Sequence, residues 1–402
     1  MNGMDNFGVE MESIGSGIEI ESTAMTMGAK IKAIGVGGGG GNMINHMISE
    51  GISGIELIVA NTDAQALDSS LAPTKLQIGM NATRGLGAGM QPEKGREAAL
   101  ESFDDIKDML AGADIVFISA GLGGGTGTGA APIIAQAAKE IGALTVSVVT
   151  SPFKFEGRKR QKLSKEGIEE LRRESDSIVI IPNEKLLSIV EKNLGIKESF
   201  RLVDDVLSQA VSGISNVILS HGPNDINLDF ADVKTVMSHR GLALMGSGRA
   251  DGSNAAYDAA KAAMESPLLD NISINGAMGI LVHFHIHPDY PILEISEAME
   301  TIEDHADEDA YVIFGTTTNS NIPIDEVKIT IVATGFEGNE SVSKDQAEKA
   351  KQASNLLSSA GVNSISARAM AAAQSRKVVG GYDNEDGENI LDVPTFLRKQ
   401  MD

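Results

Sequence analysis

A run of glycines and threonines at residues 121–129 is the strongest chemical signal in the sequence. It reads GLGGGTGTG and follows directly on an apolar, strand-like segment at 114–119. Glycine lets the backbone come close to a ligand, and threonine adds hydroxyl donors. A helical pattern follows at 130–139, with Pro132 expected in its first turn. A strand, a glycine loop and a helix N-terminus predict a phosphate site, because unpaired amides and the positive dipole end face the anion.

Two further glycine loops stand where helices are expected to start. Residues 37–42 read GGGGGN after an apolar strand pattern, and residues 83–89 read TRGLGAG before a helical pattern. Three such loops predict one polyphosphate held mostly by backbone amides. The loops at 37–42 and 121–129 contain no lysine, so the negative charge would be neutralised by a divalent metal, Arg84 and Arg160.

The first glycine loop alone leaves a second class of protein open. It resembles the phosphate loop of an NAD-dependent Rossmann oxidoreductase, and Asp63 stands near the position of a ribose-binding acid. That alternative gives the other two glycine loops no role. A Walker-type ATPase is disfavoured, because the G-K-[S/T] ending is absent from the loops at 37–42 and 121–129.

Several charged pairs could act in catalysis or binding, and each also has a purely structural interpretation. Asp229 and Asp232 share one face of a helix start, either as N-caps or as a pair that polarises water. Glu156 and Arg160, at i and i+4, could form a surface ion pair or contact a nucleotide's sugar and phosphates. Asp204 and its neighbour at 205 could favour a helix start or bind a base edge.

Histidines and the C-terminal residues complete the set of candidates. His283, His285 and His287 alternate along a predicted strand, and we interpret them as a solvated sheet face rather than a metal site. The chain ends in a short apolar and basic patch that we interpret as a peptide for docking partner proteins. Its residues are Leu391, Asp392, Val393, Pro394, Phe396 and Leu397.

Composition excludes several classes of protein. The chain has 402 residues and a net charge of −23, which would repel nucleic acid and anionic membrane surfaces. The absence of cysteine excludes disulfides, thiol catalysis and cysteine-based zinc sites. No apolar run approaches the ~20 residues that a membrane span needs, so we expect no direct membrane insertion and a soluble, cytoplasmic protein.

Alternating strand and helix patterns predict the fold class. Strands alternate with helices in the first half of the chain, which predicts an α/β domain with a Rossmann-like, mostly parallel sheet. Apolar residues at spacings of three and four over 199–220 predict a long connecting helix. A smaller α+β unit should follow, with strands at 242–245, 279–287, 310–315 and 327–334 and helices at 255–264 and 293–305.

Residues 123–129, GGGTGTG, match the G-G-G-T-G-[S/T]-G signature of the tubulin family. Together with the loop at 37–42, the Asn-Thr-Asp turn at 61–63, the 227–232 stretch and the terminal LDVPTFLR, this motif makes the chain similar to the FtsZ family, the bacterial tubulin homologues of cell division. The resemblance covers residues 28–337 and resumes in the last dozen residues.

The resemblance implies a site for GTP and GDP, with Mg²⁺ as cofactor. It puts Phe200 and Asp205 on the guanine, and Asp204 stands where the family usually has Asn. Valine at position 127 would then fill the space of a phosphate. The implied nucleotide-binding residues are Gly38, Gly39, Gly40, Gly41, Asn42, Asp63, Ala88, Gly89, Gly125, Thr126, Gly127, Thr128, Gly129, Glu156, Arg160, Asn183, Phe200 and Asp205.

The resemblance also implies a catalytic centre shared between subunits. Asn227, Asp229 and Asp232 would reach the γ-phosphate of the next subunit in a head-to-tail filament, so self-assembly would activate the GTPase. The filaments would form the division ring at midcell, on the inner face of the membrane. The C-terminal peptide would bind regulatory proteins and the adaptors that tether the filaments to the membrane.

The expected organisation follows from these patterns. It comprises a mobile tail at 1–28, a GTP-binding domain at 29–198, a connecting helix at 199–221, an α+β domain with the catalytic acids at 222–337, a flexible linker at 338–388 and the docking peptide at 389–402.

Overall fold

The computed structural model describes most of the chain between residues 28 and 336. The described ranges are 28–187, 195–219, 225–226, 228–239, 241–266, 269, 274 and 276–336. The expected tail up to residue 27, Asn227, the linker at 338–388 and the docking peptide at 389–402 lie outside them.

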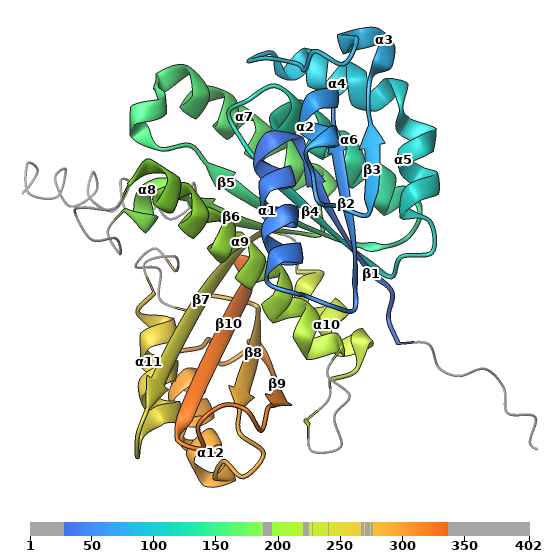
Figure 1. Cartoon of the computed structure of the whole chain (residues 1–402). Coiled ribbons are helices and arrows are strands. Elements are labelled where there is room, and N and C mark those ends of the chain that lie inside the picture. The colour runs from blue at the N-terminus through green and yellow to red at the C-terminus, as the bar shows by residue number, and fades with distance from the viewer. Residues whose placement is uncertain are drawn as a thin grey trace, which may run out of the picture. The chain divides into compact units, whose positions relative to one another are not determined.

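One continuous sheet of ten strands organises the described residues (Figure 1). Six of its strands pair in parallel, in the order β3-β2-β1-β4-β5-β6. This is the strand order of a doubly wound nucleotide-binding fold, and it confirms the predicted α/β class. The strands are β1 (Ile31–Val36), β2 (Ile55–Asn61), β3 (Thr74–Gln77), β4 (Ile115–Gly121), β5 (Leu144–Ser151) and β6 (Ser177–Pro182).

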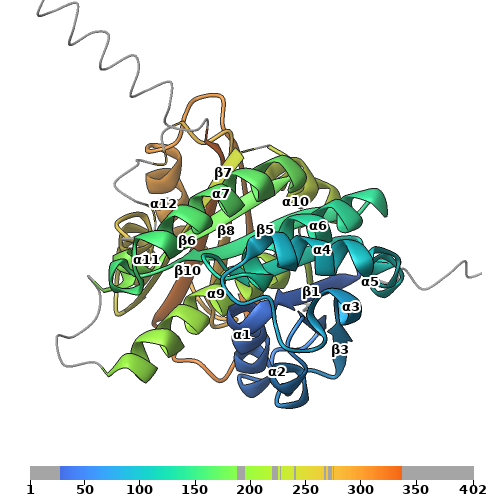
Figure 2. The same ribbon diagram turned by 90° about the horizontal axis from the view of Figure 1, so that it is seen from above.

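Helices cover both faces of these six strands, as Figure 2 shows from above. Successive residues of β1 point to opposite faces, so Ala33 packs in the layer of α1 and α9 while Ile34 packs in the layer of α4, α5 and α6. The helices are α1 (Gly37–Ser49), α2 (Ala64–Asp68), α3 (Met80–Thr83), α4 (Pro92–Glu101), α5 (Phe103–Leu110), α6 (Thr126–Glu140), α7 (Arg158–Glu174), α8 (Asn183–Leu186) and α9 (Ile196–Leu219).

The second half of the described chain extends the same sheet. β7 (Gly241–Asp251) continues it in parallel with β6, and β10 (Glu326–Phe336) pairs antiparallel with β7 and with β8 (Gly279–Ile286). β9 (Tyr311–Thr318) lies parallel to β8 at the edge. α9 and α10 (Phe230–Met237) pack on one face of these strands, while α11 (Ala255–Met264) and α12 (Ile292–Glu303) cover the other.

Helix α9 is long and apolar, but most of it is buried. Among the described residues, it alone has the length and composition that could cross a membrane. Its apolar stripe, from Val203 to Ile218, packs against the core on one face of the sheet. The burial of this stripe explains its apolar composition without a membrane.

Two sequence-based expectations about local structure were wrong. The run at 37–42 is not a loop before a helix but lies inside α1, which begins at Gly37, and the run at 121–129 is a loop only as far as Gly125, because α6 begins at Thr126. Pro132 therefore lies inside α6 rather than in its first turn. The glycines themselves form the first turns, which brings their backbone amides to the edge of the sheet.

The histidine face of β8 is also not solvated as expected. His283 is buried beneath α9 and its Nε2 lies 2.8 Å from the Thr317 hydroxyl. Burial lowers the pKa of His283 to about 4. Among the described residues, no group of three or more His, Asp or Glu side chains could hold a metal ion.

Candidate nucleotide-binding site

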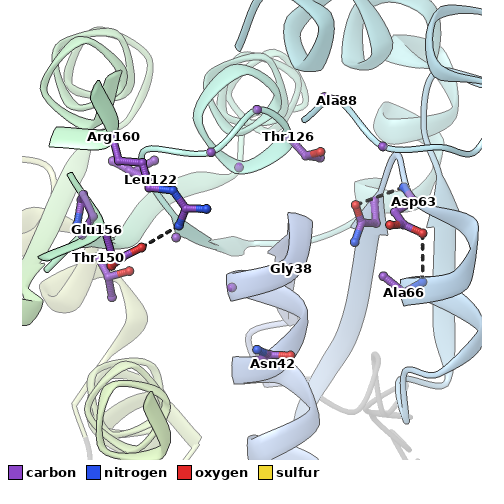
Figure 3. Close-up of a pocket in the computed structure, with 18 of the residues that line it drawn as sticks. Gly38, Asn42, Asp63, Ala66, Ala88, Leu122, Thr126, Thr150, Glu156 and Arg160 are labelled. Carbon is purple, nitrogen blue, oxygen red and sulfur yellow. Dashed lines mark hydrogen bonds and ion pairs between the residues drawn. The ribbon is translucent and has the colours of Figure 1, made fainter. Parts of the chain in front are cut away.

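A cavity of about 540 Å³ lies at the carboxyl ends of the parallel strands (Figure 3). Doubly wound sheets bind ligands at this edge, where the connections from β1 and β4 diverge to opposite faces. The cavity is lined by Gly38, Gly39, Asn42, Asn61, Asp63, Ala66, Leu86, Gly87, Ala88, Gly89, Gly121, Leu122, Gly124, Gly125, Thr126, Gly127, Thr150, Pro152, Glu156, Arg160, Asn183, Phe200, Val203, Asp204 and Leu207.

The N-termini of α1 and α6 meet at this cavity. A β-carbon added to Gly37 would lie 3.0 Å from the Gly127 amide nitrogen, and one added to Gly39 would lie 3.0 Å from the Gly121 Cα. The two first turns thus touch through backbone, which only glycine permits. Two sets of unpaired amides and two positive dipole ends therefore face one space, as a polyphosphate site requires.

Some glycines of these runs line the cavity, and others permit close packing of the helices. β-carbons added to Gly38 or Gly124 would meet no atom within 4 Å, so these residues border open space in the cavity. By contrast, β-carbons at Gly40 and Gly129 would lie 2.2 Å from the Ser119 oxygen and 1.9 Å from the Pro92 oxygen. Gly40 and Gly129 are not among the lining residues and serve helix packing.

Position 127 also serves close packing. A β-carbon there would lie 2.6 Å from the Gly121 carbonyl oxygen, so a valine would strike the end of β4 before it filled a phosphate position. Gly41 and Thr128 likewise do not line the cavity, and the Thr128 hydroxyl accepts a hydrogen bond from the Gly123 amide at 2.9 Å.

The third glycine loop, at residues 83–89, closes one side of the cavity. Gly85, Gly87 and Gly89 have positive φ angles, and Arg84 is the only non-glycine residue in the described part of the chain that does. The Gly87 amide donates to the Thr62 carbonyl at 3.2 Å, which presents Ala88 and Gly89 to the cavity. Arg84 is exposed and is not among the residues that line the cavity.

Glu156 and Arg160 form the ion pair that their spacing predicts, at the wall of the cavity. Arg160 Nη1 lies 2.6 Å from Glu156 Oε2, and both side chains line the cavity. The Phe153 amide also donates to Glu156 Oε1 at 2.9 Å, which orients this carboxylate. Figure 3 shows the pair on one side of Gly38 and Asn42, across the cavity from Asp63.

Asn183 provides an independent sign of a missing ligand. It is buried at the start of α8 and lines the cavity, yet its Oδ1 has no hydrogen-bond partner among the described residues. A buried amide oxygen without a partner costs about 1–3 kcal/mol. A ligand hydroxyl would remove that cost.

The structure places the two adjacent acids of α9 differently. Asp204 lines the cavity, whereas Asp205 does not and instead lies 2.6 Å from His46 Nε2 on α1. Burial raises the pKa of Asp204 to about 6, and the negative charge of Asp205 adds to this effect while His46 opposes it. Phe200, one turn before Asp204, also lines the cavity.

Asp63 has a structural role in addition to its place in the lining. Its Oδ1 accepts hydrogen bonds from the amides of Gln65 at 2.9 Å and Ala66 at 3.2 Å, so it caps the N-terminus of α2. Its carboxylate therefore already has partners before any ligand binds.

The remaining candidate acids lie beyond the other end of α9. Asp229 is exposed at the N-cap position of α10 but makes no capping hydrogen bond through its side chain. Asp232 is half-buried in the first turn of α10. Phe200 and Leu207 in the first half of α9 line the cavity, and the helix then runs on to Leu219 before the chain reaches these acids.

Sequence reasoning missed several lining residues. Thr150 and Asn61 lie at the carboxyl ends of β5 and β2, where the rule for doubly wound sheets would have found them. Val203 and Leu207 belong to the apolar stripe of α9, and their spacing resembles that of ordinary core residues. Periodicity alone does not separate a side chain that lines a cavity from one that fills the core.

Comparison with known proteins agrees with this geometry. Residues 30–191 match the Tubulin/FtsZ family, GTPase domain, and residues 241–337 match the FtsZ family, C-terminal domain. The chain is 44% identical to the "Cell division protein FtsZ" of Helicobacter pylori J99, over 99% of this chain and 98% of that protein. It is 46% identical to the protein of the same name from Pseudomonas aeruginosa, over 95% of this chain and 99% of that protein.

A solved structure shares the fold. The empty FtsZ dimer of M. jannaschii is similar with a TM-score of 0.72 and 45% identity, over 78% of this chain and 89% of that chain. The similarity includes both halves of the sheet, because the match spans most of the described residues.

Proposed function

The chain belongs to the FtsZ family of tubulin-like GTPases that act in cell division, and from that premise we propose that its cavity binds GTP and that a neighbouring subunit completes the catalytic centre. GTPase activity and guanine-nucleotide binding follow from the family. The NAD-dependent oxidoreductase alternative is not favoured, because the family accounts for all three glycine runs.

In the proposed complex, the phosphates lie against the first turns of α1 and α6. Their amides and dipole ends stabilise the negative charge, and residues 87–89 enclose the terminal phosphate. Glu156, Arg160 and Asn183 contact the sugar and phosphates, which gives the Asn183 Oδ1 a partner. Asn42 and Thr126 contribute polar side chains at the two helix starts.

Asp204, rather than Asp205, receives the guanine base in this proposal. An ionised carboxylate accepts both the N1–H and the N2–H of guanine, whereas adenine offers no such donor pair at this edge. The Phe200 ring, one turn away, packs on the base. Asp204 is supported by its place in the cavity lining, and Asp205 is occupied by His46.

The length of α9 is the observation that carries the in-trans proposal. Leu207 is the last residue of α9 that lines the cavity, and the helix runs on to Leu219, about 18 Å further at ~1.5 Å per residue, before the chain reaches Asp229 and Asp232. No side chain crosses that distance, so these acids do not serve the cavity of their own subunit. A head-to-tail contact would bring them to the cavity of the next subunit, and such heterologous contacts propagate into filaments.

The proposed chemistry is hydrolysis of the γ-phosphate. Asp229 and Asp232 of one subunit, with Asn227 from outside the described residues, orient a water molecule and accept its proton. The water oxygen bonds to the γ-phosphorus while the bond to the β–γ bridging oxygen breaks, which yields GDP and phosphate. The α1 and α6 amides of the other subunit stabilise the transferring phosphoryl group.

Mg²⁺ is the proposed cofactor. It would be held mainly by phosphate oxygens and water, since the described residues contain no cluster of three metal-binding side chains. When bound, it would neutralise charge on the β- and γ-phosphates, a task for which neither α1 nor α6 supplies a lysine in its first turn.

The test compares binding and turnover in one variant. Asp232→Ala should keep wild-type affinity for GTP and lose turnover by roughly 10²–10⁴-fold, because only proton transfer and water positioning are removed. Wild-type turnover per molecule should rise steeply with protein concentration, measured together with light scattering. Turnover that is independent of concentration, or loss of GTP binding in the variant, would contradict the proposal.

The proposed filaments also suggest a location for the protein in the cell. We propose that its head-to-tail filaments form the division ring on the inner face of the membrane at midcell. Because the chain carries a net charge of −23, adaptor proteins rather than lipid would hold the filaments there. The proposed adaptor-binding residues, 391–394 with Phe396 and Leu397, lie outside the described part of the chain.

A further inference from the structure

An ion pair joins α1 and α9 beside the base end of the cavity. His46 follows Asn42 by one helical turn, so both lie on the same face of α1, and Asn42 lines the cavity. His46 Nε2 lies 2.6 Å from Asp205 Oδ1. The His46 side chain is only 12% exposed and that of Asp205 is 37% exposed, so the pair is partly withdrawn from water.

The pair borders the carboxyl group that faces the base. Asp204 and Asp205 are consecutive, yet one lines the cavity and the other turns to α1. The positive charge of protonated His46 favours the ionised form of Asp204, while burial and the Asp205 charge disfavour it. His46 thus opposes the two effects that would leave a proton on Asp204.

We propose that His46 and Asp205 are a positioning pair for Asp204: their ion pair fixes α9 against α1, and the charge of His46 favours the ionised Asp204 carboxylate that accepts the guanine N–H donors. The inference rests on the proposed function, in which Asp204 binds the base. It makes nucleotide binding a proton-linked event: the bound state requires ionised Asp204, whereas the free protein at mildly acidic pH carries a proton there.

The sign of the pH dependence follows from this linkage. Affinity is complete where Asp204 is ionised in the free protein, above a pKa of about 6, and it falls as the pH drops through that value. Other charged side chains that line the cavity are Asp63 before α2, and Glu156 with Arg160, which pair with each other. His46 and Asp205 are the charged groups that shift the pKa of Asp204.

The experiment measures GDP binding to the full chain by calorimetry at several pH values. Between about pH 8 and pH 5, wild-type affinity should fall about tenfold more than that of Asp204→Asn, which does not titrate. The second ionisation of the GDP β-phosphate, with a pKa of about 6, affects both proteins equally and cancels in this comparison. Equal slopes for the two proteins would overturn the inference, whereas an absence of wild-type GDP binding at every pH would overturn the proposed function instead.

A matched pair of variants tests His46 itself. His46→Gln keeps a hydrogen-bonding side chain without the charge, and it should move the midpoint of the affinity profile to higher pH. His46→Lys keeps a positive charge and should restore a midpoint close to the wild-type value. If His46 only held the helices together, His46→Gln would instead lower affinity by the same factor at every pH, and that result would refute the inference. Circular dichroism melts confirm that each variant is folded before the profiles are compared.

Discussion

The cavity beside the first half of α9 and the acids beyond its end differ in how complete a site each forms within one subunit. Near its start, a cavity of about 540 Å³ is lined by residues from both halves of the parallel sheet, with glycine backbones already in contact. Beyond its end, Asp229 is exposed and caps no helix amide through its side chain. The difference agrees with the proposal that one subunit binds the nucleotide and that Asp229 and Asp232 act on the nucleotide of a second subunit.

Filling the cavity should give the largest effect. Gly124→Val adds a side chain where a β-carbon meets no atom within 4 Å, so it should occupy ligand space and leave the fold intact. We expect GTP affinity to fall roughly a hundredfold or more, because the added volume must be displaced before a ligand binds. Calorimetric titration measures the loss.

Gly127→Val is the matched control for this prediction. Its β-carbon would lie 2.6 Å from the Gly121 oxygen, so this variant should lose thermal stability as well as affinity. If Gly124→Val also melted at a much lower temperature, or bound GTP normally, the distinction between lining and packing glycines would be wrong.

Mixing two inactive variants would test whether the two ends work across subunits. Asp232→Ala keeps an intact cavity and Gly124→Val keeps intact acids, so each alone should be inactive. In a random equimolar filament, about one quarter of the contacts would join an intact cavity to intact acids and recover that share of turnover. Phosphate release measures the recovery.

Co-sedimentation provides the control for the mixture. The test requires that Gly124→Val is incorporated into the filaments. Because this variant is expected to bind little GTP, its presence in the pellet must be shown. A mixture that co-sediments and still releases no phosphate would place the acids and the cavity in the same subunit.

The parts of the cavity formed by local backbone geometry were predictable from the sequence, whereas those that depend on packing between helices were not. The glycine runs and the parallel strand series predicted the cavity wall at the starts of α1 and α6, because backbone geometry there is encoded locally by residues such as Gly38 and Gly125. The lining that α9 contributes was not predictable from sequence alone, since Asp204 and Asp205 are adjacent acids on one helix. Only the packing of α9 against His46 decides which carboxylate faces the cavity.

Burial of the C-terminal sheet face escaped sequence reasoning for a similar reason. Alternation predicted that His283, His285 and His287 share one side of a strand, and it did not reveal that α9 covers that side at His283. The polar residues of α9 that meet this face, such as Gln209 and Ser212, resemble a solvated helix surface in the sequence. Tertiary packing between distant segments leaves no local pattern.

A fall in pH should change the contributions of His283 and Asp204 to the free energy of unfolding in opposite directions. Burial lowers the pKa of His283 to about 4, below that of an unfolded histidine, so the stability it contributes is present above about pH 6.5 and is lost as the pH falls toward 4. Its neighbours His285 and Lys328 also disfavour its charged form, while Asp225 favours it. Asp204 has a raised pKa, so without nucleotide it opposes this loss below about pH 6.

A single variant isolates the histidine contribution. His283→Asn keeps a polar partner for the Thr317 hydroxyl and does not titrate in this range. Between about pH 7 and pH 4.5, wild type should lose on the order of 2–3 kcal/mol more unfolding free energy than the variant. Urea denaturation at the two pH values measures the difference. Parallel losses in both proteins would show that His283 is not the titrating group.

The smallest effect is expected at Asp63, which belongs to the cavity and to a helix cap at once. Asp63→Asn keeps an oxygen that can accept from the Gln65 and Ala66 amides, whereas Asp63→Ala removes it. The alanine variant should lose about 1 kcal/mol of unfolding free energy and the asparagine variant less. If both variants lost stability equally while GTP affinity rose, charge repulsion with phosphate rather than capping would be the dominant role of Asp63. Capping as the main role instead predicts that the two variants differ in stability and bind GTP with affinities close to that of wild type, because the carboxylate already has its partners within the subunit.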